Sequence, residues 1–503
     1  MIGASLICAG CGALHPWQAA EPWRCPRVRV SHDHDDTDHL LQRRIDTPLA
    51  LPGDSHAASD ADEPLPFVRF RQRLFAYHRA RAMGVDDADF IALVRTLDAQ
   101  VAAIAGTGFR STPLRASPSL AKQLGLPSGS TLWCKDESEN VSGSHKGRHL
   151  FGLLLEILVD EALASGQTLS AVLAERADRG RPLAIASCGN AARAAAVLAR
   201  ACGRRLLVFI PPTAEASTQA HLRALGADVT ICTRAAPHRD PARHSAAGDP
   251  TYRAFQAAVA AGALPFCCQG PENGLTIQGA HTIVYELLDA LGPRRQRLRH
   301  LFVQVGGGAL LSAVVAALAE AVQSGLLSTL PRVYAVQTSA VAPLVRAYQR
   351  ILAEISKALP ATEYPAIAPS LFPRWAEILT QPAQQSAVRQ ALHFARQHRH
   401  AFMWPWTMVG EPHSLARGIL DDETYDWACA LQGMLSSGGY PVLASEAALA
   451  QAHTAAKQAG FLRVCATGSA GLAGLLTRMQ EDAFSSEISD GEDVAVLLTG
   501  AER

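Results

Sequence analysis

The sequence has no long apolar run and no excess of charge of either sign. Its 503 residues include 46 Lys and Arg against 46 Asp and Glu, so the formal net charge is +0. No stretch approaches the ~18 consecutive apolar residues of a membrane-spanning helix, and we expect no membrane association. A nucleic-acid-binding protein normally carries a basic excess, so we expect no nucleic-acid partner either. The first residues also lack the basic and apolar regions of a secretory signal.

Aromatic residues are few, and the cysteines do not form a disulfide pattern. Only 6% of the residues are aromatic, although 48% are hydrophobic. This apolar content excludes a disordered chain and predicts a large core built from small side chains. The 11 cysteines are odd in number and scattered, which indicates the reduced thiols of a cytoplasmic protein. The length predicts several domains or one large composite domain, because a domain typically has roughly 100–200 residues.

The first ~110 residues differ in composition from the remainder. They begin with three cysteines and continue with a polar stretch rich in His and Asp and a linker over residues 51–66. Helices are predicted at residues 67–83 and 86–104. From residue 131 onward, short apolar runs alternate with helical periods, which is typical of βαβ units and a mainly parallel sheet.

This alternation predicts a series of strands and helices. Strands are expected at residues 132–135, 182–187, 205–210, 228–232, 301–305 and 333–337. Helices are expected at residues 146–164, 191–202, 218–225, 278–291 and 312–323. Residues 350–406 carry no chemical signal. The fold class is therefore predicted to be α/β.

Four short motifs stand where a predicted strand ends and a helix begins. The first is KDESENVSGSHKGR at residues 135–148, in which Lys146 begins a helix behind a flexible turn. A lysine there can reach a cofactor aldehyde, and the turn gives the backbone close access. The second is SCGN, where Ser187, Gly189 and Asn190 can bind an anion or a phenolic oxygen. An ordinary asparagine helix cap is the alternative.

The third motif is a run of three glycines between a buried strand and a helix. Backbone N–H groups in such a turn can hold a phosphate, and a plain tight turn is the alternative. It lacks the Lys-Ser/Thr ending of a P-loop and does not fit the dinucleotide-binding pattern. The fourth motif, VCATGSAG at residues 464–471, places hydroxyl groups at another turn. The residues concerned are Gly306, Gly307, Gly308, Ala309 and Leu310 in the third motif, and Thr467 and Ser469 in the fourth.

In this order, the four motifs resemble those of the fold-type II pyridoxal-phosphate enzymes, the tryptophan synthase β superfamily, and within it threonine synthase and its relatives. The family's Lys-x-Glu-x-x-Asn-Pro-Thr-Gly-Ser-Phe-Lys-Asp-Arg corresponds to KDESENVSGSHKGR here, and its Ser-Ser-Gly-Asn to SCGN. The resemblance covers residues 105–500 and includes VYAVQTSAVAPL and the closing VAVLLTG. It implies two sub-domains, each with an open, twisted, mainly parallel sheet, and a cofactor cleft between them.

The resemblance also implies a domain plan. An N-terminal ribbon-like element is followed by a linker with a helical arm and by the catalytic domain, in which a smaller sub-domain is inserted. The expected limits are residues 1–50 for the ribbon, 51–110 for the arm, 111–503 for the catalytic domain and about 145–260 for the insertion.

Each motif has a role that the resemblance implies. Lys146 would bond pyridoxal 5'-phosphate and move the α-proton of the substrate. The SCGN residues would bind the phenolic oxygen of the cofactor, and the glycine run with the two residues after it would hold the phosphate. Thr467, with Ser469 as the alternative, would face the pyridine nitrogen. A hydroxyl there, in place of a carboxylate, favours elimination and replacement over transamination.

Several positions near the expected substrate depart from the family's pattern. The family's Phe-Lys-Asp-Arg becomes HKGR, and its Pro-Thr becomes VS. We expect Ser142, Ser144 and His145 to lie against the substrate, with a solvent-facing ring as the alternative for His145. His413 and Arg417 are candidate ligands for a substrate anion, and solvated loop residues are the alternative.

The N-terminal cysteines resemble part of the zinc ribbon with which many threonine synthase relatives begin. Cys8 and Cys11 form an intact pair, and Cys25 begins a second pair whose partner position holds valine. Structural zinc sites have four ligands, so we expect a degenerate ribbon without metal. The alternative is a Cys₃His site that His32 or His34 completes.

The sequence therefore predicts a cytoplasmic, pyridoxal-phosphate-dependent lyase that acts on a small amino acid. The first expectation is a threonine synthase-like conversion of O-phosphohomoserine and water to threonine and phosphate. The alternatives are a diaminopropionate ammonia-lyase, a threonine dehydratase or a cysteate synthase-like enzyme, and a cofactor-binding scaffold without turnover. A homodimer is expected by analogy with the superfamily.

Overall fold

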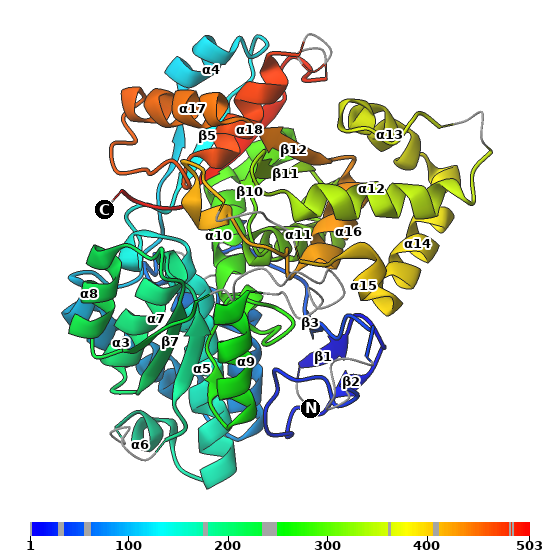
Figure 1. The fold of residues 1–503 in the computed structure, drawn as a ribbon. Helices are drawn as coiled ribbons and strands as arrows, with labels where there is room; N and C mark the ends of the chain where they lie inside the picture. Colours follow the sequence, from blue (N-terminus) through cyan, green and yellow to red (C-terminus); the bar gives the residue numbers. More distant parts are fainter. Residues whose placement is uncertain are drawn as a thin grey trace.

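A large six-stranded sheet forms the centre of the molecule (Figure 1). The computed structural model describes residues 3–28, 35–54, 62–174, 180–233, 249–360, 364–405, 412–481, 484 and 487–502. The strands are, in spatial order, β12 (Pro441–Ala444), β11 (Arg332–Thr338), β10 (Leu298–Gln304), β13 (Asp493–Leu498), β5 (Leu132–Asp136) and β4 (Leu114–Ala116). All neighbours pair in parallel except the edge strand β4, which is antiparallel to β5.

A second, four-stranded sheet is parallel throughout. Its strands are, in spatial order, β8 (Asp228–Ile231), β7 (Leu206–Ile210), β6 (Leu183–Ala186) and β9 (Leu264–Pro265). The predicted α/β fold with two mainly parallel sheets is confirmed. The domain limits expected from the sequence remain a prediction.

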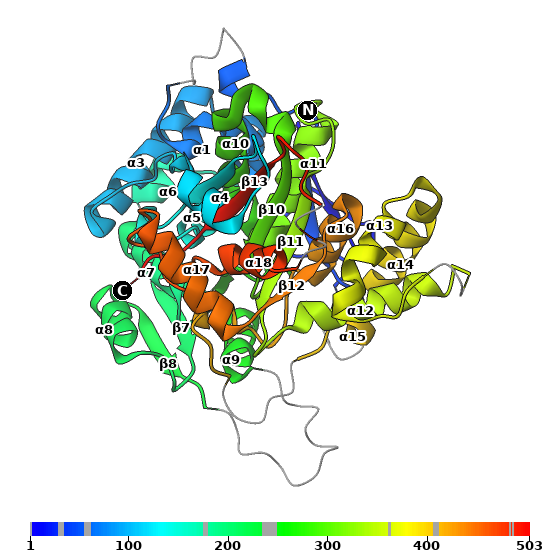
Figure 2. The ribbon, with the colours of Figure 1, turned by 90° about the horizontal axis from the view of Figure 1, so that it is seen from above.

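Helices cover the large sheet on both faces (Figure 2). One face packs against α10 (Thr276–Leu291), α11 (Ala309–Gln323) and α16 (Trp427–Ser437). The other face packs against α18 (Ala470–Met479), which in turn contacts α17 (Glu446–Gln458). The strands between these layers are almost wholly buried, which explains why they are continuous apolar runs instead of alternating sequences.

One long helix connects the two sheets. This helix, α5 (Lys146–Ser165), packs against α10 of the large sheet and against α7 (Asn190–Ala201) of the small one. The small sheet also carries α8 (Ala216–Ala224) and α9 (Pro250–Ala260), and α3 (Asp87–Ala105) lies on α7. The sequence predicted α5, α7, α8 and α10 with boundaries within two residues of those observed.

The helix predicted over residues 67–83 is wrong as a single element. It is divided into α1 (Pro66–Arg69), a 3₁₀ turn and α2 (Phe75–Ala82). The break buries two guanidinium groups: Arg71 pairs with Asp87, and Arg73 donates to the Thr47 carbonyl and pairs with Glu320. A continuous helix at this place would not direct both arginines to these partners.

Residues 350–406, in which the sequence shows no catalytic motif, contribute to a helical layer at one side of the large sheet (Figure 1). It contains α12 (Pro343–Ser356), α13 (Phe372–Leu379), α14 (Gln385–Gln397) and α15 (Arg399–Phe402). Within the described ranges, no helix has the length and apolar character needed to cross a membrane.

The N-terminal residues form a small antiparallel sheet beside α15 (Figure 1). Its strands are, in spatial order, β2 (Leu14–His15), β1 (Ala4–Cys8) and β3 (Leu41–Ile45). Arg43 on β3 enters the main body, where Nη2 donates to Tyr285 at 2.9 Å and to Glu320 at 2.8 Å. This sheet is therefore joined to the main body by buried polar contacts.

Two glycines allow α5 and α10 to pack with their backbones in contact. A Cβ atom on Gly279 would lie 2.0 Å from the Arg148 carbonyl oxygen, and one on Gly152 would lie 2.8 Å from the Gly279 Cα. The obstructing atoms belong to the backbone, so they cannot move aside as a flexible side chain can.

Replacing Gly279 with alanine tests this close approach. In an open helix, Gly→Ala stabilises by about 0.5–1 kcal/mol. Here we expect Gly279→Ala to lower the free energy of unfolding by about 1–3 kcal/mol, because the two helices must separate. Urea denaturation of the wild type and the variant measures the difference. A gain in stability would show that the helices do not depend on this contact.

Candidate active site

Three of the four sequence motifs follow strands, namely β5, β6 and β10. The fourth was expected after a strand, but it follows the helix α17 and lies beside the end of β13, where Val464 bridges to Ala501. Lys146 begins α5, Asn190 begins α7, and the glycine run connects β10 to α11. Thr467 precedes α18, and the end of β13 lies among these turns. Open α/β folds bind their ligands at this edge. The structure thus brings to one edge residues that are more than 300 positions apart in the chain.

The N-terminus of α5 is held by a fully buried cluster of charges. Arg148 donates from Nε to Glu137 Oε2 at 2.8 Å, and from Nη1 and Nη2 to the two oxygens of Glu286 at 2.6 and 2.9 Å. Lys135 Nζ also donates to Glu286, at 2.5 Å. Two cations therefore face two carboxylates, and the position of Lys146, two residues before Arg148, is fixed by these pairs.

The Glu137 carboxylate in this cluster remains ionised. Burial acts to raise the pKa of Glu137, but the positive charges of Arg148 and Lys135 outweigh it and hold the pKa at about 2. Thr112 adds hydrogen bonds to Glu137 and Glu286. The cluster is consequently a rigid support for the lysine and has no free group for chemistry.

The Lys146 ammonium group has no carboxylate within 4.0 Å among the described residues, although Asp421 and Asp426 act on it electrostatically. It is only partly buried, whereas most of the helix behind it is wholly buried. An amine that is held by its backbone and not paired is suited to react with an aldehyde.

His145, predicted as a substrate contact, is buried against the end of β13. Its Nδ1 lies 3.1 Å from the Thr499 carbonyl oxygen, and its backbone N–H donates to the same oxygen at 3.3 Å. Burial and the nearby Lys146 charge lower its pKa to about 3, so the ring is neutral. The solvent-facing alternative is therefore wrong, and the contact with β13 gives this ring a structural role. A direct contact with substrate stays a prediction.

The two serines of the first motif differ in their surroundings. Ser144 is buried, its hydroxyl accepts the Lys146 N–H at 3.4 Å, and it bridges to Gly500. Ser142 is partly exposed and has a positive φ of 59°, a conformation that few residues other than glycine adopt. The turn is therefore strained immediately before Lys146, as turns at functional sites often are.

The SCGN motif faces the end of β13. A Cβ atom on Gly500 would lie 2.9 Å from Asn190 Nδ2 and 3.2 Å from Cys465 Sγ. The Ser187 hydroxyl accepts the Gly189 N–H at 3.3 Å and so shapes the turn before α7. Asn190 is thereby placed between the turn of the second motif and the turn of the fourth.

An acidic loop, residues 417–426, closes over the glycine run. The carbonyl of Gly306 accepts from the Thr424 hydroxyl at 3.1 Å, and that of Gly307 accepts from the Asp426 N–H at 3.0 Å. Asp421 lies on the other side of the turn, where the Gly307 backbone N–H acts to lower the pKa of its carboxyl group. The N–H side of the turn therefore already receives an anionic group.

Side chains larger than hydrogen do not fit this turn. A Cβ atom on Gly306 would lie 2.1 Å from Asp421 Oδ2, and Gly308 has a φ of 96°, which favours glycine. Ala309 and Leu310 follow as the first residues of α11, and both are buried. The glycine run is thus required by its surroundings.

The structure distinguishes the two candidates for the pyridine nitrogen. The Ser469 hydroxyl donates to the Cys465 and Ala466 carbonyls, at 3.2 and 3.3 Å, and is wholly buried in its own turn. The Thr467 hydroxyl is partly exposed and accepts the Gly418 N–H at 3.1 Å, which leaves its own proton free to donate. This geometry favours Thr467, and the assignment stays a prediction.

Two candidates, unlike the residues of the buried turns, have exposed side chains. His413 is exposed, and Arg417 is exposed and paired with Glu215 at 2.8 Å. The residues that the sequence reasoning missed are Asp421 and Asp426, both in the same segment. The string DDETYD was a visible signal, but acidic strings are usually solvated, and only the fold places these carboxylates against the glycine run.

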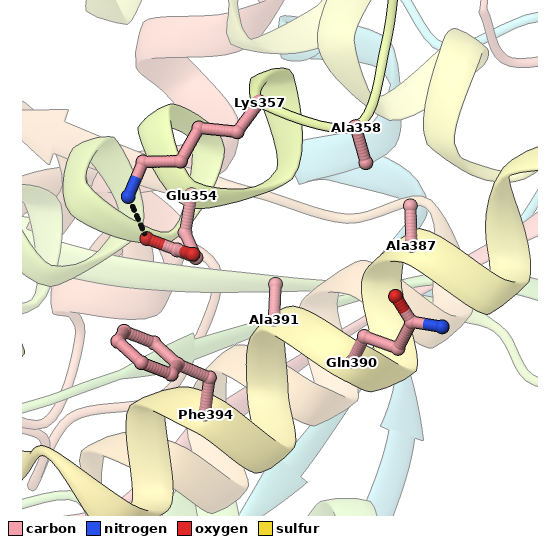
Figure 3. A pocket seen from close by; sticks show the side chains of 7 residues that line it. All are labelled: Glu354, Lys357, Ala358, Ala387, Gln390, Ala391 and Phe394. Atoms are coloured by element: carbon pink, nitrogen blue, oxygen red, sulfur yellow. Dashed lines mark hydrogen bonds and ion pairs between the residues drawn. The ribbon is translucent and has the colours of Figure 1, made fainter.

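A shallow hollow of about 240 Å³ lies elsewhere, between α12 and α14 (Figure 3). It is lined mainly by aliphatic and aromatic atoms, such as Ala391 and Phe394, and its ion pair joins Lys357 to Glu354 at 2.6 Å. Neither helix carries any of the four motifs, so this hollow is separate from the candidate site.

Comparison with known families gives the identity of the chain. A family model described as pyridoxal-phosphate dependent enzyme matches residues 106–398, more than half of the chain. The chain belongs to this family. No curated protein matches the sequence.

Solved structures of pyridoxal-phosphate enzymes share the fold. Diaminopropionate ammonia lyase from Escherichia coli has a TM-score of 0.53 and 15% identity, over 82% of this chain and 88% of that chain. The T.th. threonine deaminase has a TM-score of 0.50 and 20% identity, over 83% and 98%. Maize serine racemase has a TM-score of 0.50 and 18% identity, over 82% and 93%. The fold-type II assignment is therefore confirmed.

The residues at the site fit the family's cofactor, pyridoxal 5'-phosphate. Lys146 supplies an amine that no carboxylate pairs with in the described part of the chain. The glycine turn already has the Asp421 carboxylate beside it, an anion chemically similar to a phosphate oxygen. Thr467 supplies a neutral hydroxyl. The donor set of this family member thus contains an aldehyde-reactive amine, an anion cradle and an uncharged partner for a ring nitrogen.

Loss of the buried arginine should strongly destabilise the protein. Arg148→Met would leave Glu137 and Glu286 with Lys135 as their only buried cation, and we expect a loss of about 3–5 kcal/mol. Arg205→Met is the matched control, because Arg205 pairs with Asp228 on the surface and should contribute less than about 1 kcal/mol. Chemical denaturation measures both, and equal losses would contradict the supporting role of the cluster.

Asp421 should make cofactor affinity depend on pH. Burial raises its pKa to about 6, with Lys146 opposing this shift and Asp249 and Asp422 adding to it. A phosphate in the glycine turn would raise this pKa further, so binding takes up a proton and weakens as the pH rises above about 6. A further rise of about one unit corresponds to about tenfold in affinity.

Asp421→Asn removes this contribution. We expect the variant to bind pyridoxal 5'-phosphate about tenfold more tightly than the wild type at pH 8 and almost equally at pH 5. Absorbance titrations at both values measure the affinities, and Asp228→Asn, a change at an exposed carboxylate on β8, is the control. Weaker binding by Asp421→Asn at pH 8 would show that the carboxylate helps to hold the cofactor.

Proposed function

We propose that the protein catalyses a pyridoxal-phosphate-dependent elimination from a small amino acid whose leaving group is neutral or cationic, as in an ammonia-lyase. The observation that carries this proposal is the charge around Lys146. Among the described residues, Asp421 and Asp426 are the carboxylates that act on it. Burial raises the pKa of Asp421 to about 6 and that of Asp426 to about 7, so both exchange protons near neutral pH.

Groups of the chain would carry out the proton transfers. The cofactor, when bound, supplies an electron sink for the electron pair left at the substrate α-carbon. Lys146 Nζ would accept the α-proton. It would return this proton to a departing hydroxyl, which leaves as water, whereas an ammonium group leaves as ammonia and takes up no further proton. A neutral Thr467 hydroxyl at the ring nitrogen supports elimination over transamination.

The acidic surroundings also bear on substrate choice. A carboxylate attracts a substrate that carries a second ammonium group and repels one that carries an added phosphate. A 2,3-diamino acid or a hydroxy amino acid is therefore favoured over a phosphorylated one. The fold does not decide between these substrates, because ammonia lyases, deaminases and racemases share it.

The threonine synthase-like reaction remains the alternative, supported by the motif pattern of the sequence. It requires a site for the phosphate of O-phosphohomoserine. Arg417, a candidate for that phosphate, is paired with Glu215. This pairing places the reaction second.

A substrate panel on the cofactor-loaded enzyme tests the proposal. We expect ammonia and a 2-oxo acid to be released from 2,3-diaminopropionate, serine or threonine, and little phosphate from O-phosphohomoserine. Lys146→Ala should abolish release and the visible absorbance of the lysine-bound cofactor, whereas Lys122→Ala, on the remote helix α4 (Pro118–Leu124), should change neither. Phosphate release as the main activity would establish the alternative, and a loaded enzyme that turns over none of these would be a scaffold.

A further inference from the structure

The N-terminal sheet gathers four metal-binding side chains at one point, independently of the proposed function. Cys8, Cys11, Cys25 and His39 each offer one ligand atom, and these atoms all lie within 4.8 Å of one another. The other apolar side chains of this corner are few: Ala13, Val28 and Leu41, the first residue of β3. We propose that these four residues form a structural zinc site.

The distances agree with tetrahedral coordination. Ligands about 2.0–2.3 Å from zinc, at tetrahedral angles, lie roughly 3.5–3.8 Å from one another. Cys11 Sγ and Cys25 Sγ are 3.7 Å apart, and Cys8 Sγ and His39 Nδ1 are 3.5 Å apart. These two separations match the tetrahedral values, and the remaining ones are all within 4.8 Å.

The backbone around the cysteines is arranged to hold thiolates. The Cys11 N–H donates to Cys8 Sγ at 3.5 Å, and the Arg27 N–H donates to Cys25 Sγ at 3.5 Å. Each bond comes from the turn that follows a cysteine, three residues after Cys8 and two residues after Cys25. Such bonds favour the negatively charged sulfur that binds a metal.

A carboxylate fixes the histidine in the orientation for coordination. Asp35 Oδ2 lies 3.0 Å from His39 Nε2, on the side of the ring away from the sulfurs. It would hold the proton on Nε2 and leave Nδ1 as the free ligand atom. This carboxylate–histidine arrangement is a common outer shell of zinc sites.

The proposal replaces the metal-free ribbon that the sequence predicts. The second cysteine pair lacks its partner, and the fourth ligand comes from His39, which the return of the chain to β3 brings back beside Cys8. His32 and His34, the candidates named from the sequence, lie outside the described residues. No spacing rule identifies His39, because its distance from Cys25 in the sequence differs from that of a ribbon.

The site would anchor the segment that joins the ribbon to the main body. The Asp38 N–H donates to the Arg396 carbonyl at 2.7 Å, and the Arg399 N–H donates to that of Asp36 at 2.8 Å. Leu40 packs against Gly270: a Cβ atom added to Gly270 would lie 2.8 Å from Leu40 Cδ1. These contacts flank His39, so a metal bound there would fix how the ribbon docks on the main body.

Metal analysis of the full-length wild type is the first test. We expect about one zinc ion per chain after purification without added metal. Zinc should be released when a mercurial reagent blocks the thiols, and cobalt(II) should replace it and show thiolate-to-metal charge-transfer absorption. A protein without metal, whether its thiols are free or Cys11 is joined to Cys25 in a disulfide, would overturn the proposal.

Variants then test the ligand set. Cys8→Ser and His39→Ala should lose most of the zinc, and His39→Cys should retain it, with a change in the cobalt spectrum because a fourth thiolate replaces the imidazole. Cys232→Ser and His393→Ala, changes at residues remote from the cluster, are the matched controls. Retained visible absorbance of the lysine-bound cofactor shows that a zinc-free variant is folded. Unchanged zinc content in both Cys8→Ser and His39→Ala would overturn the ligand assignment.

Discussion

The buried pairing of Arg148 with Glu137 and Glu286 is the interaction on which the site depends. It joins the helix that carries Lys146 to the end of β5, where Glu137 follows the strand, and to Glu286 on α10. The contact between Gly279 and the Arg148 backbone sets the separation of the same two helices. Charge and shape therefore act at one place, and the lysine has a single position because its helix cannot slide or turn without breaking both.

The second part of the site is the glycine run, residues 306–308, which is tightly enclosed by the acidic loop. Its carbonyls are bonded by the acidic loop, which leaves N–H groups to face an anion. The same loop brings Asp421 to that side, so the site contains an acidic group where its ligand is also acidic. If the proposed function is correct, cofactor affinity, the protonation of Asp421 and the choice of substrate all depend on this one segment of the chain.

Local patterns were sufficient for much of this architecture. The limits of α5 and α7 follow from helical periodicity and from turn residues, and the motifs meet because the carboxyl ends of parallel strands lie at one edge. Other features depend on partners distant in the sequence. The break at Arg71 and Arg73 follows from Asp87 and Glu320, and Asp421 and His39 gain their surroundings only when separate loops come together. Such long-range contacts leave no periodic signal.

The buried position of Arg43 has a consequence for the order in which the protein is made. Its partner Glu320 lies 277 residues further along the chain, so most of the protein must leave the ribosome before this guanidinium is neutralised. Domains usually fold from the N-terminus as they emerge. Here the N-terminal sheet cannot form its contact with Glu320 early. Its docking on the main body follows the synthesis of α11, which carries Glu320.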